Sequence, residues 1–121
     1  MYGFETEHSS LACDWVSTYD EMLSNVIKLG FSTIRLPFSH DYIHNTDMKS
    51  MDYFFQAISK TNLQVVLDFH RIYNSHQSPK PNSEQHTTEC FINDWITILD
   101  RYKNNSHLVG ADLFNEWQDG N

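Results

Sequence analysis

Apolar and polar residues alternate along this chain in patterns that predict four strands separated by three helices. The stretch LQVVLDFH has the period-two alternation of a strand, with its apolar residues on one face and Asp68 and His70 on the other. The stretch FSTIRLP alternates in the same way, places Arg35 on its polar face, and is expected to end at Pro37. Polar side chains therefore gather on one face of both strands.

Another strand is predicted in the stretch HLVGADLFNEW, residues 107–117. Its apolar run has no helical period, is typical of a fully buried parallel strand, and ends in Asn115 and Glu116. A carboxylate beside an amide at the carboxyl end of a buried strand is a candidate acid or base with an orienting partner. The alternative is a disordered chain end. The opening stretch MYGFET is short and aromatic, and we interpret it as the end of the remaining strand.

The three helices are predicted from apolar residues at helical spacing. Thr18 and Glu21 form a capping-box pattern ahead of the first helix, and Gly30 is suited to end it. The second helix is expected from Thr46, and the third from about Thr88 to Lys103. Strands and helices thus alternate, which demands an α/β fold with parallel strands and right-handed crossovers.

The stretch from Arg71 to Thr88, between the third predicted strand and the third helix, contains two prolines and shows no period. We therefore expect a long loop at the carboxyl end of that strand. No glycine-rich phosphate loop follows any strand, which argues against nucleotide binding. The gathering of polar residues on one face favours a barrel-like curl of the sheet over a flat doubly wound sheet.

Composition narrows the range of partners. The formal net charge is -8, and the eight Lys and Arg residues are scattered singly, which argues against nucleic acid or an anionic membrane as a partner. No apolar stretch approaches the length of a membrane span, and we expect no signal peptide within the given sequence. Cys13 and Cys90 make no disulfide framework, and unpaired thiols are the simpler expectation.

Four ordered stretches resemble a known enzyme family. GFET, LGFSTIRLPFS, VVLDFHR and VGADLFNEW, with a tryptophan shortly before RYKNN, are similar to the N-terminal half of glycoside hydrolase family 5, the cellulases and endoglucanases. The resemblance implies that residues 1–121 form half of a (β/α)₈ barrel, strands 1 to 4 with three intervening helices. It also implies retaining hydrolysis of a β-linked polysaccharide or oligosaccharide, without a cofactor and outside the cell.

The resemblance also implies roles for individual residues. Glu116 matches the acid/base of the family, and Asn115 matches the amide that binds the sugar 2-hydroxyl. Arg35 matches a residue that stabilises the ionised nucleophile, and His70 matches one that binds substrate or a neighbouring catalytic group.

Each role has an alternative. Trp15 and Trp117 are candidate platforms for sugar rings, but ordinary packing is the more common use of tryptophan. Arg35 pairs equally well with Asp68 on the next strand as a structural salt bridge.

Zinc binding is an alternative role for the histidines. His70, His76, His86 and Cys90 are potential ligands, but their intervals match no compact ligand pattern, so we predict no metal.

The length of the chain limits how much of a family member it can contain. A (β/α)₈ barrel takes about 250 residues, and the resemblance places the nucleophilic glutamate on strand 7, which the 121 residues do not reach. Three hypotheses follow, and whether the isolated chain is an enzyme is left open. The chain is a fragment of a glycoside hydrolase, or it completes a barrel as a homodimer or with a separate C-terminal half, or it is a non-catalytic carbohydrate-binding or structural half-barrel that self-associates.

Overall fold

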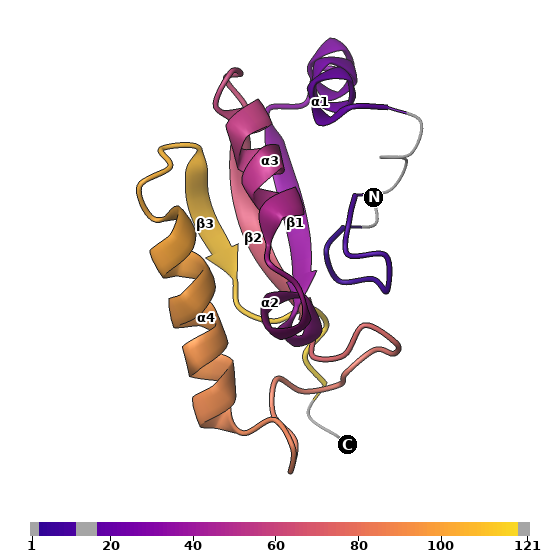
Figure 1. Ribbon diagram of the computed structural model, residues 1–121, viewed down its shortest axis with the longest axis vertical. Coiled ribbons are helices and arrows are strands. Elements are labelled where there is room, and N and C mark those ends of the chain that lie inside the picture. The colour runs from indigo at the N-terminus through magenta and orange to yellow at the C-terminus, as the bar shows by residue number, and fades with distance from the viewer. Residues whose placement is uncertain (1–2, 12–16, 119–121) are drawn as a thin grey trace.

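A three-stranded parallel sheet forms the centre of the protein. The computed structural model describes residues 3–11 and 17–118 and shows α2 and α3 in front of the sheet, with α4 beside its last strand (Figure 1). The elements in chain order are α1 (Tyr19–Lys28), β1 (Thr33–Ser39), α2 (His40–Asn45), α3 (Lys49–Ile58), β2 (Gln64–Arg71), α4 (Thr88–Tyr102) and β3 (Leu108–Asp112).

The strands lie in the order β1-β2-β3, and both pairs are parallel. Leu36 pairs with Leu67, and Leu67 pairs with Ala111, so the central strand joins the other two in register. The predicted alternation of helices and parallel strands is confirmed. Because the strands run the same way, their carboxyl ends meet at one edge of the sheet.

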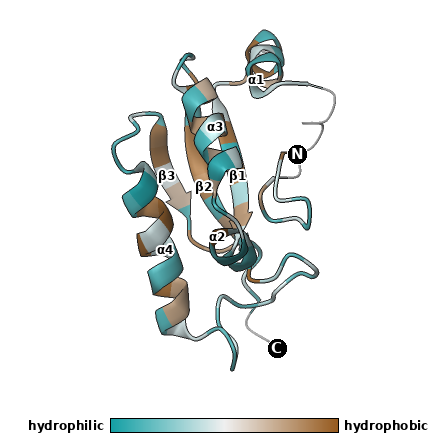
Figure 2. Ribbon diagram, viewed as in Figure 1, coloured by the Kyte–Doolittle hydropathy of each residue, from teal (hydrophilic) through white to brown (hydrophobic). Residues whose placement is uncertain are grey.

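One face of the sheet packs against the helices and forms the core. The odd-numbered residues of β2 and the even-numbered residues of β1 point to this face, as the sequence alternation predicted. Brown residues line the strands in Figure 2, whereas the helices alternate between brown and teal. The fully buried residues of this layer include Leu36, Phe38, Met51, Phe54, Ile58, Val65, Leu67 and Phe69.

The caps of α1 are those that the sequence predicts. The hydroxyl of Thr18 accepts a hydrogen bond from the Glu21 N–H, and the Glu21 carboxylate accepts one from the Thr18 N–H. That backbone N–H holds the pKa of Glu21 below its usual range. Gly30 follows the helix at φ 88°, a conformation that costs glycine little.

Pro37 does not end β1, contrary to our prediction. The Pro37 carbonyl accepts a hydrogen bond from the Phe4 N–H, on the side of β1 that faces away from β2. In a strand the nitrogen and the carbonyl of one residue point to the same side. The missing N–H of Pro37 therefore removes no bond to β2, and the strand continues to Ser39. Among residues 3–11, the predicted first strand is reduced to the single bridge between Phe4 and Phe38.

The prediction that the last strand is fully buried is wrong. β3 forms the edge of the sheet within the described part of the chain, and the side chains of Val109 and Leu113 are 51% and 64% exposed. A second difference is α2, a six-residue helix that starts at the Ser39 cap and that no sequence pattern indicated. None of the helices in the described ranges is long and apolar enough to span a membrane.

An ion pair links α3 to α4. Arg101 donates two hydrogen bonds to the Asp52 carboxylate, at 2.8 and 2.6 Å, and the Tyr102 hydroxyl donates a third at 2.8 Å. The Tyr102 ring stacks on Phe55 with a centroid distance of 4.1 Å. The Arg101 guanidinium holds the pKa of Asp52 below its usual range.

Truncating the centre of the core should be costly. Leu67→Ala removes a wholly buried side chain of β2, so we expect the free energy of unfolding to fall by about 2–5 kcal/mol. Leu29→Ala is the matched control, since Leu29 is 75% exposed. The free energy of unfolding of both variants would be measured by urea titration. Equal unfolding midpoints for the two variants would contradict the placement of β2 at the centre of the core.

The ion pair of Asp52 with Arg101 should make the free energy of unfolding depend on pH. A carboxyl whose pKa is lowered by folding contributes stability above its unfolded pKa of about 4 and loses it as the pH falls through the folded value. We expect Asp52→Asn to cost about 0.5–1 kcal/mol at pH 7, and this difference to vanish near pH 2. Asp20→Asn, in the exposed pair with Lys60, is the control. A difference that persists undiminished at pH 2 would refute this reading.

Candidate active site

The carboxyl ends of the three strands bring polar side chains to one edge of the sheet. This edge lies at the lower end of the molecule in Figure 1, beside the long loop between β2 and α4. In parallel α/β proteins the reactive side chains lie at this edge. The strands form a rigid support, and the strand ends and the loops that follow them carry the reactive residues.

Arg35 on β1 is the centre of the site. Its Nε and Nη2 lie 3.1 and 2.9 Å from one carboxylate oxygen of Asp112 on β3. The same Nη2 donates to Oδ1 of Asn115 at 2.9 Å. It also lies 3.1 Å from Oδ1 of Asp68 on β2, an ion pair that lacks hydrogen-bond geometry. One guanidinium thus joins all three strands.

Asp68 and His70 form the second part of the network. The Asp68 side chain is completely buried, and its Oδ2 lies 2.7 Å from Nδ1 of His70. A carboxylate only accepts hydrogen bonds, so Nδ1 of His70 carries a hydrogen and the Nε2 of a neutral ring is an acceptor. That Nε2 lies 3.5 Å from Nδ2 of Asn115. The Asn115 amide is therefore oriented with its oxygen toward Arg35 and its nitrogen toward His70.

The backbone also fixes Asn115. Its N–H donates to the Phe69 carbonyl at 3.0 Å, which extends the pairing of β2 with the chain beyond β3. Glu116 comes next at φ 49°, in the left-handed region that residues with a side chain seldom adopt, and its side chain is exposed. Such backbone outliers gather at active sites. Gln118 then donates to the Pro79 carbonyl at 2.8 Å, which ties this segment to the β2–α4 loop.

The structure unites most of the predicted site. Arg35, His70 and Asn115 lie in one hydrogen-bonded network, and Glu116 is the next residue in the chain. Trp117 is 56% exposed, and its ring lies 6.5 Å from that of Phe114. Trp15 lies outside the described residues.

The sequence analysis missed Asp112. It is the direct neighbour of Asp68 in the β2–β3 register and accepts two hydrogen bonds from Arg35. Its place at the end of the LVGAD stretch was the available signal, since a single carboxylate ends an otherwise apolar strand. The suggested pair between Arg35 and Asp68 is present as one part of the larger network.

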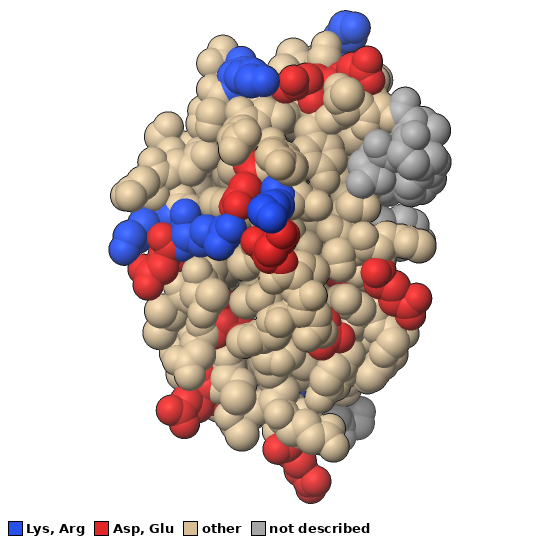
Figure 3. Space-filling view, in the orientation of Figure 1, with Lys and Arg blue, Asp and Glu red and all other residues tan. Residues whose placement is uncertain are grey.

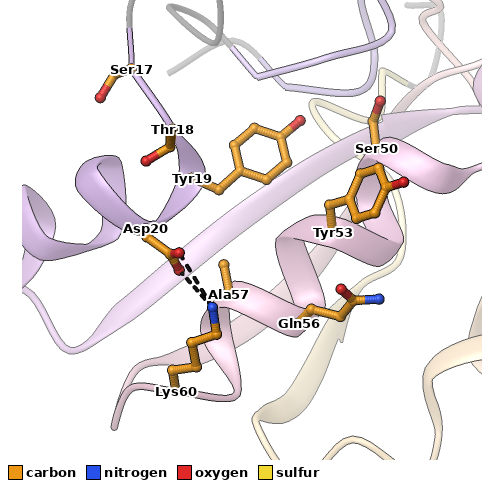
Figure 4. A pocket seen from close by; sticks show the side chains of 9 residues that line it. All are labelled: Ser17, Thr18, Tyr19, Asp20, Ser50, Tyr53, Gln56, Ala57 and Lys60. Carbon is orange, nitrogen blue, oxygen red and sulfur yellow. Dashed lines mark hydrogen bonds and ion pairs between the residues drawn. The ribbon is translucent and has the colours of Figure 1, made fainter.

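A cleft elsewhere does not belong to this edge. It has a volume of about 450 Å³ and lies between α1 and α3, with the ion pair of Asp20 and Lys60 crossing it (Figure 4). In Figure 1, α1 lies at the opposite end of the sheet from the carboxyl ends of the strands. We therefore assign this cleft no part in the candidate site.

A parallel sheet that gathers polar side chains at the carboxyl ends of its strands is the arrangement found in (β/α)₈ barrels. The family model for cellulase (glycosyl hydrolase family 5) matches residues 1–121, and this chain belongs to that family. The fold agrees, because an endocellulase from Pyrococcus horikoshii, in complex with cellotetraose, superposes with a TM-score of 0.86 at 30% identity, covering 94% of this chain and 35% of that one.

Two bacterial relatives are similar over nearly the whole chain. An endoglucanase from Paenibacillus polymyxa is 33% identical over 99% of this chain and 36% of its own length. The major extracellular endoglucanase of Xanthomonas campestris is 28% identical over 100% of this chain and 30% of its own length. Its catalytic domain superposes with a TM-score of 0.83 over 98% of this chain and 41% of that structure. The chain thus spans about a third of the curated relatives that it matches.

The buried carboxylate of Asp68 should be needed for stability. Asp68→Asn replaces one acceptor oxygen with an N–H₂ group that faces either Arg35 or His70, both of which donate. We expect a loss of about 1–3 kcal/mol in unfolding free energy. Asp100→Asn, in an exposed pair with Lys103, is the matched control and should change little. Equal effects of the two changes in a denaturant titration would show that the network contributes no stability.

Proposed function

We propose that this chain carries the acid/base side of an endo-β-glucanase site that works by the retaining mechanism. The observation that supports it best is the hydrogen bond from Arg35 to Asn115, directly before Glu116, in a chain of the cellulase family. In this proposal Glu116 protonates the leaving glycosidic oxygen and later removes a proton from the attacking water. Its exposed side chain leaves the carboxyl open to a substrate.

Asn115 would position the sugar. Its oxygen accepts from Arg35, and one of its two amide hydrogens is directed at His70. The second amide hydrogen is then available for the sugar 2-hydroxyl, a contact that strengthens in the transition state. His70 and Arg35 would hold the amide in this orientation, and Trp117, with Trp15, would offer flat faces to neighbouring sugar rings.

The nucleophile must come from elsewhere. Retaining hydrolysis needs a second carboxylate about 5 Å from the acid/base, but Asp68 and Asp112 are both engaged by Arg35. We propose that the nucleophile belongs to polypeptide beyond these 121 residues, in keeping with the part of each relative that the chain covers. Arg35, which is about half exposed, would then face that carboxylate and favour its ionised form.

The proposed substrate is a β-linked glucan. Similar structures of the Pyrococcus horikoshii endocellulase were determined with cellotetraose. The Xanthomonas campestris relative is described as extracellular, and we propose the same location for the present protein.

A chimera tests this function. Residues 1–121 would replace the matching segment of the Paenibacillus polymyxa endoglucanase, and reducing-sugar release from carboxymethylcellulose would be measured. We expect an active chimera in which Glu116→Gln lowers kcat/KM by about 10²–10⁴-fold, the usual contribution of a general acid–base. Glu84→Gln, an exposed carboxyl in the β2–α4 loop, is the matched control and should leave the rate unchanged.

An active chimera that is insensitive to Glu116→Gln would contradict the acid/base assignment. A folded but inactive chimera, together with cellulose binding by the 121-residue chain alone, would instead favour the non-catalytic carbohydrate-binding half-barrel.

A further inference from the structure

Three histidines surround one buried carboxylate on the helix side of the sheet. Asp94 of α4 has one oxygen, Oδ2, 2.7 Å from Nδ1 of His40 and 2.8 Å from Nε2 of His86. Its other oxygen, Oδ1, lies 2.7 Å from Nε2 of His44. The histidines come from α2 and from the β2–α4 loop, so this cluster joins three separate segments.

The cluster is separate from the candidate active site. The His86 ring lies 6.2 Å from the ring of Phe69, whose side chain packs on the helix face of β2. Asp68 and His70 point from the same strand to the opposite face. Asp94 and His86 are almost completely buried, at 1% and 2% exposure, whereas His40 and His44 open the cluster to the surface at α2.

The contacts of His86 require a proton or a metal ion between its ring and Asp94. Nδ1 of His86 lies 2.9 Å from the Pro81 carbonyl, which can only accept, so this nitrogen carries a hydrogen. If the ring is neutral, Nε2 carries a lone pair and can only accept a hydrogen bond. It faces the Asp94 oxygen, which is also an acceptor. Two acceptors 2.8 Å apart repel each other unless a proton or a metal ion lies between them.

We propose that His40, His86 and Asp94 bind a divalent transition-metal ion, with zinc as the first candidate. Potential ligand atoms of these three residues lie within 4.8 Å of one another. Tetrahedral zinc places nitrogen and oxygen ligands about 3.3 Å apart, so the ion needs the two rings to move outward by about half an ångström. Two imidazoles and one carboxylate suit zinc better than calcium or magnesium, which prefer oxygen ligands.

The surroundings of the cluster suit a metal site. Metal-binding histidines usually donate their second ring N–H to a carbonyl or carboxylate, as His86 does to Pro81. His44 orients the carboxylate through its other oxygen and leaves the fourth position of the metal to water. In Figure 3 the Lys and Arg side chains of the visible face lie in its upper half.

The proposal departs from the sequence-based expectation that the chain binds no metal. Of the potential ligands in the sequence pattern, His70, His76, His86 and Cys90, only His86 belongs to the proposed site. Bound zinc would connect α2, the β2–α4 loop and α4. It would thereby hold in place the loop that contacts Gln118, two residues after Glu116.

Zinc binding by the full chain tests the proposal. Protein treated with EDTA and then dialysed would be titrated with ZnCl₂ in a calorimeter, with metal content measured after dialysis. We expect one Zn²⁺ per chain, and a thermal unfolding midpoint that rises with Zn²⁺ concentration, because the ion binds the folded state. His40→Asn should weaken binding by at least about tenfold. Because His40 is partly exposed, this variant should fold even where His86→Asn does not.

His76→Asn and Cys90→Ser are the matched controls. His76 is an exposed histidine of the same loop, and Cys90 lies in the first turn of α4. Unchanged Zn²⁺ affinity in both controls, with weakened binding in His40→Asn, supports the site. Absence of Zn²⁺ binding by the wild-type chain, or binding that His40→Asn leaves intact, would overturn it.

Discussion

The arrangement at the carboxyl ends of the strands depends on the hydrogen bonds of the Arg35 guanidinium. This group projects from β1, crosses β2, and binds Asp112 at the end of β3 and the Asn115 amide just beyond it. This reach is possible only because the three strands are parallel and in register, so that their ends meet. The carboxylates of Asp68 and Asp112 both pair with this single positive charge. The amide that precedes Glu116 takes its orientation from the same guanidinium.

The sheet separates two polar networks with different properties. On one face, Arg35 and Asp112 are partly exposed, and their network holds the groups proposed to contact sugar. On the other face, Asp94 and His86 are buried among aromatic rings, where an uncompensated charge is costly. The β2–α4 loop touches both, through the Pro79 carbonyl that binds Gln118 and the Pro81 carbonyl that binds His86. The conformation of this loop therefore helps to fix the position of Gln118, which follows Glu116 by two residues.

The sequence predicts those features that depend on local patterns. The alternation in LQVVLDFH assigned Asp68 and His70 to the polar face, and the cap at Thr18 located α1. Pro37 was misread because the direction of its carbonyl depends on the tertiary neighbour Phe4. β3 was read as buried because an apolar run does not reveal whether a strand lies at the edge of a sheet.

The missed parts of both networks depend on contacts between distant residues. Asp112 reaches Arg35 across 77 positions of the chain, after an irregularity in the β2–β3 register that local alternation does not indicate. The histidine cluster joins residues about 50 positions apart, and α2 is too short to show a helical period. Family resemblance indicated Arg35, His70, Asn115 and Glu116 as candidate site residues, but it did not provide their hydrogen-bond partners.

A double-mutant cycle between Arg35 and Asp112 tests the central claim most directly. The unfolding free energies of Arg35→Gln, Asp112→Asn and the double variant would be measured by urea titration beside the wild type. If the guanidinium joins β1 to β3, the two substitutions couple by about 1 kcal/mol. Effects that add to within about 0.3 kcal/mol would mean that the two side chains do not interact, and would contradict the parallel edge on which the site is built.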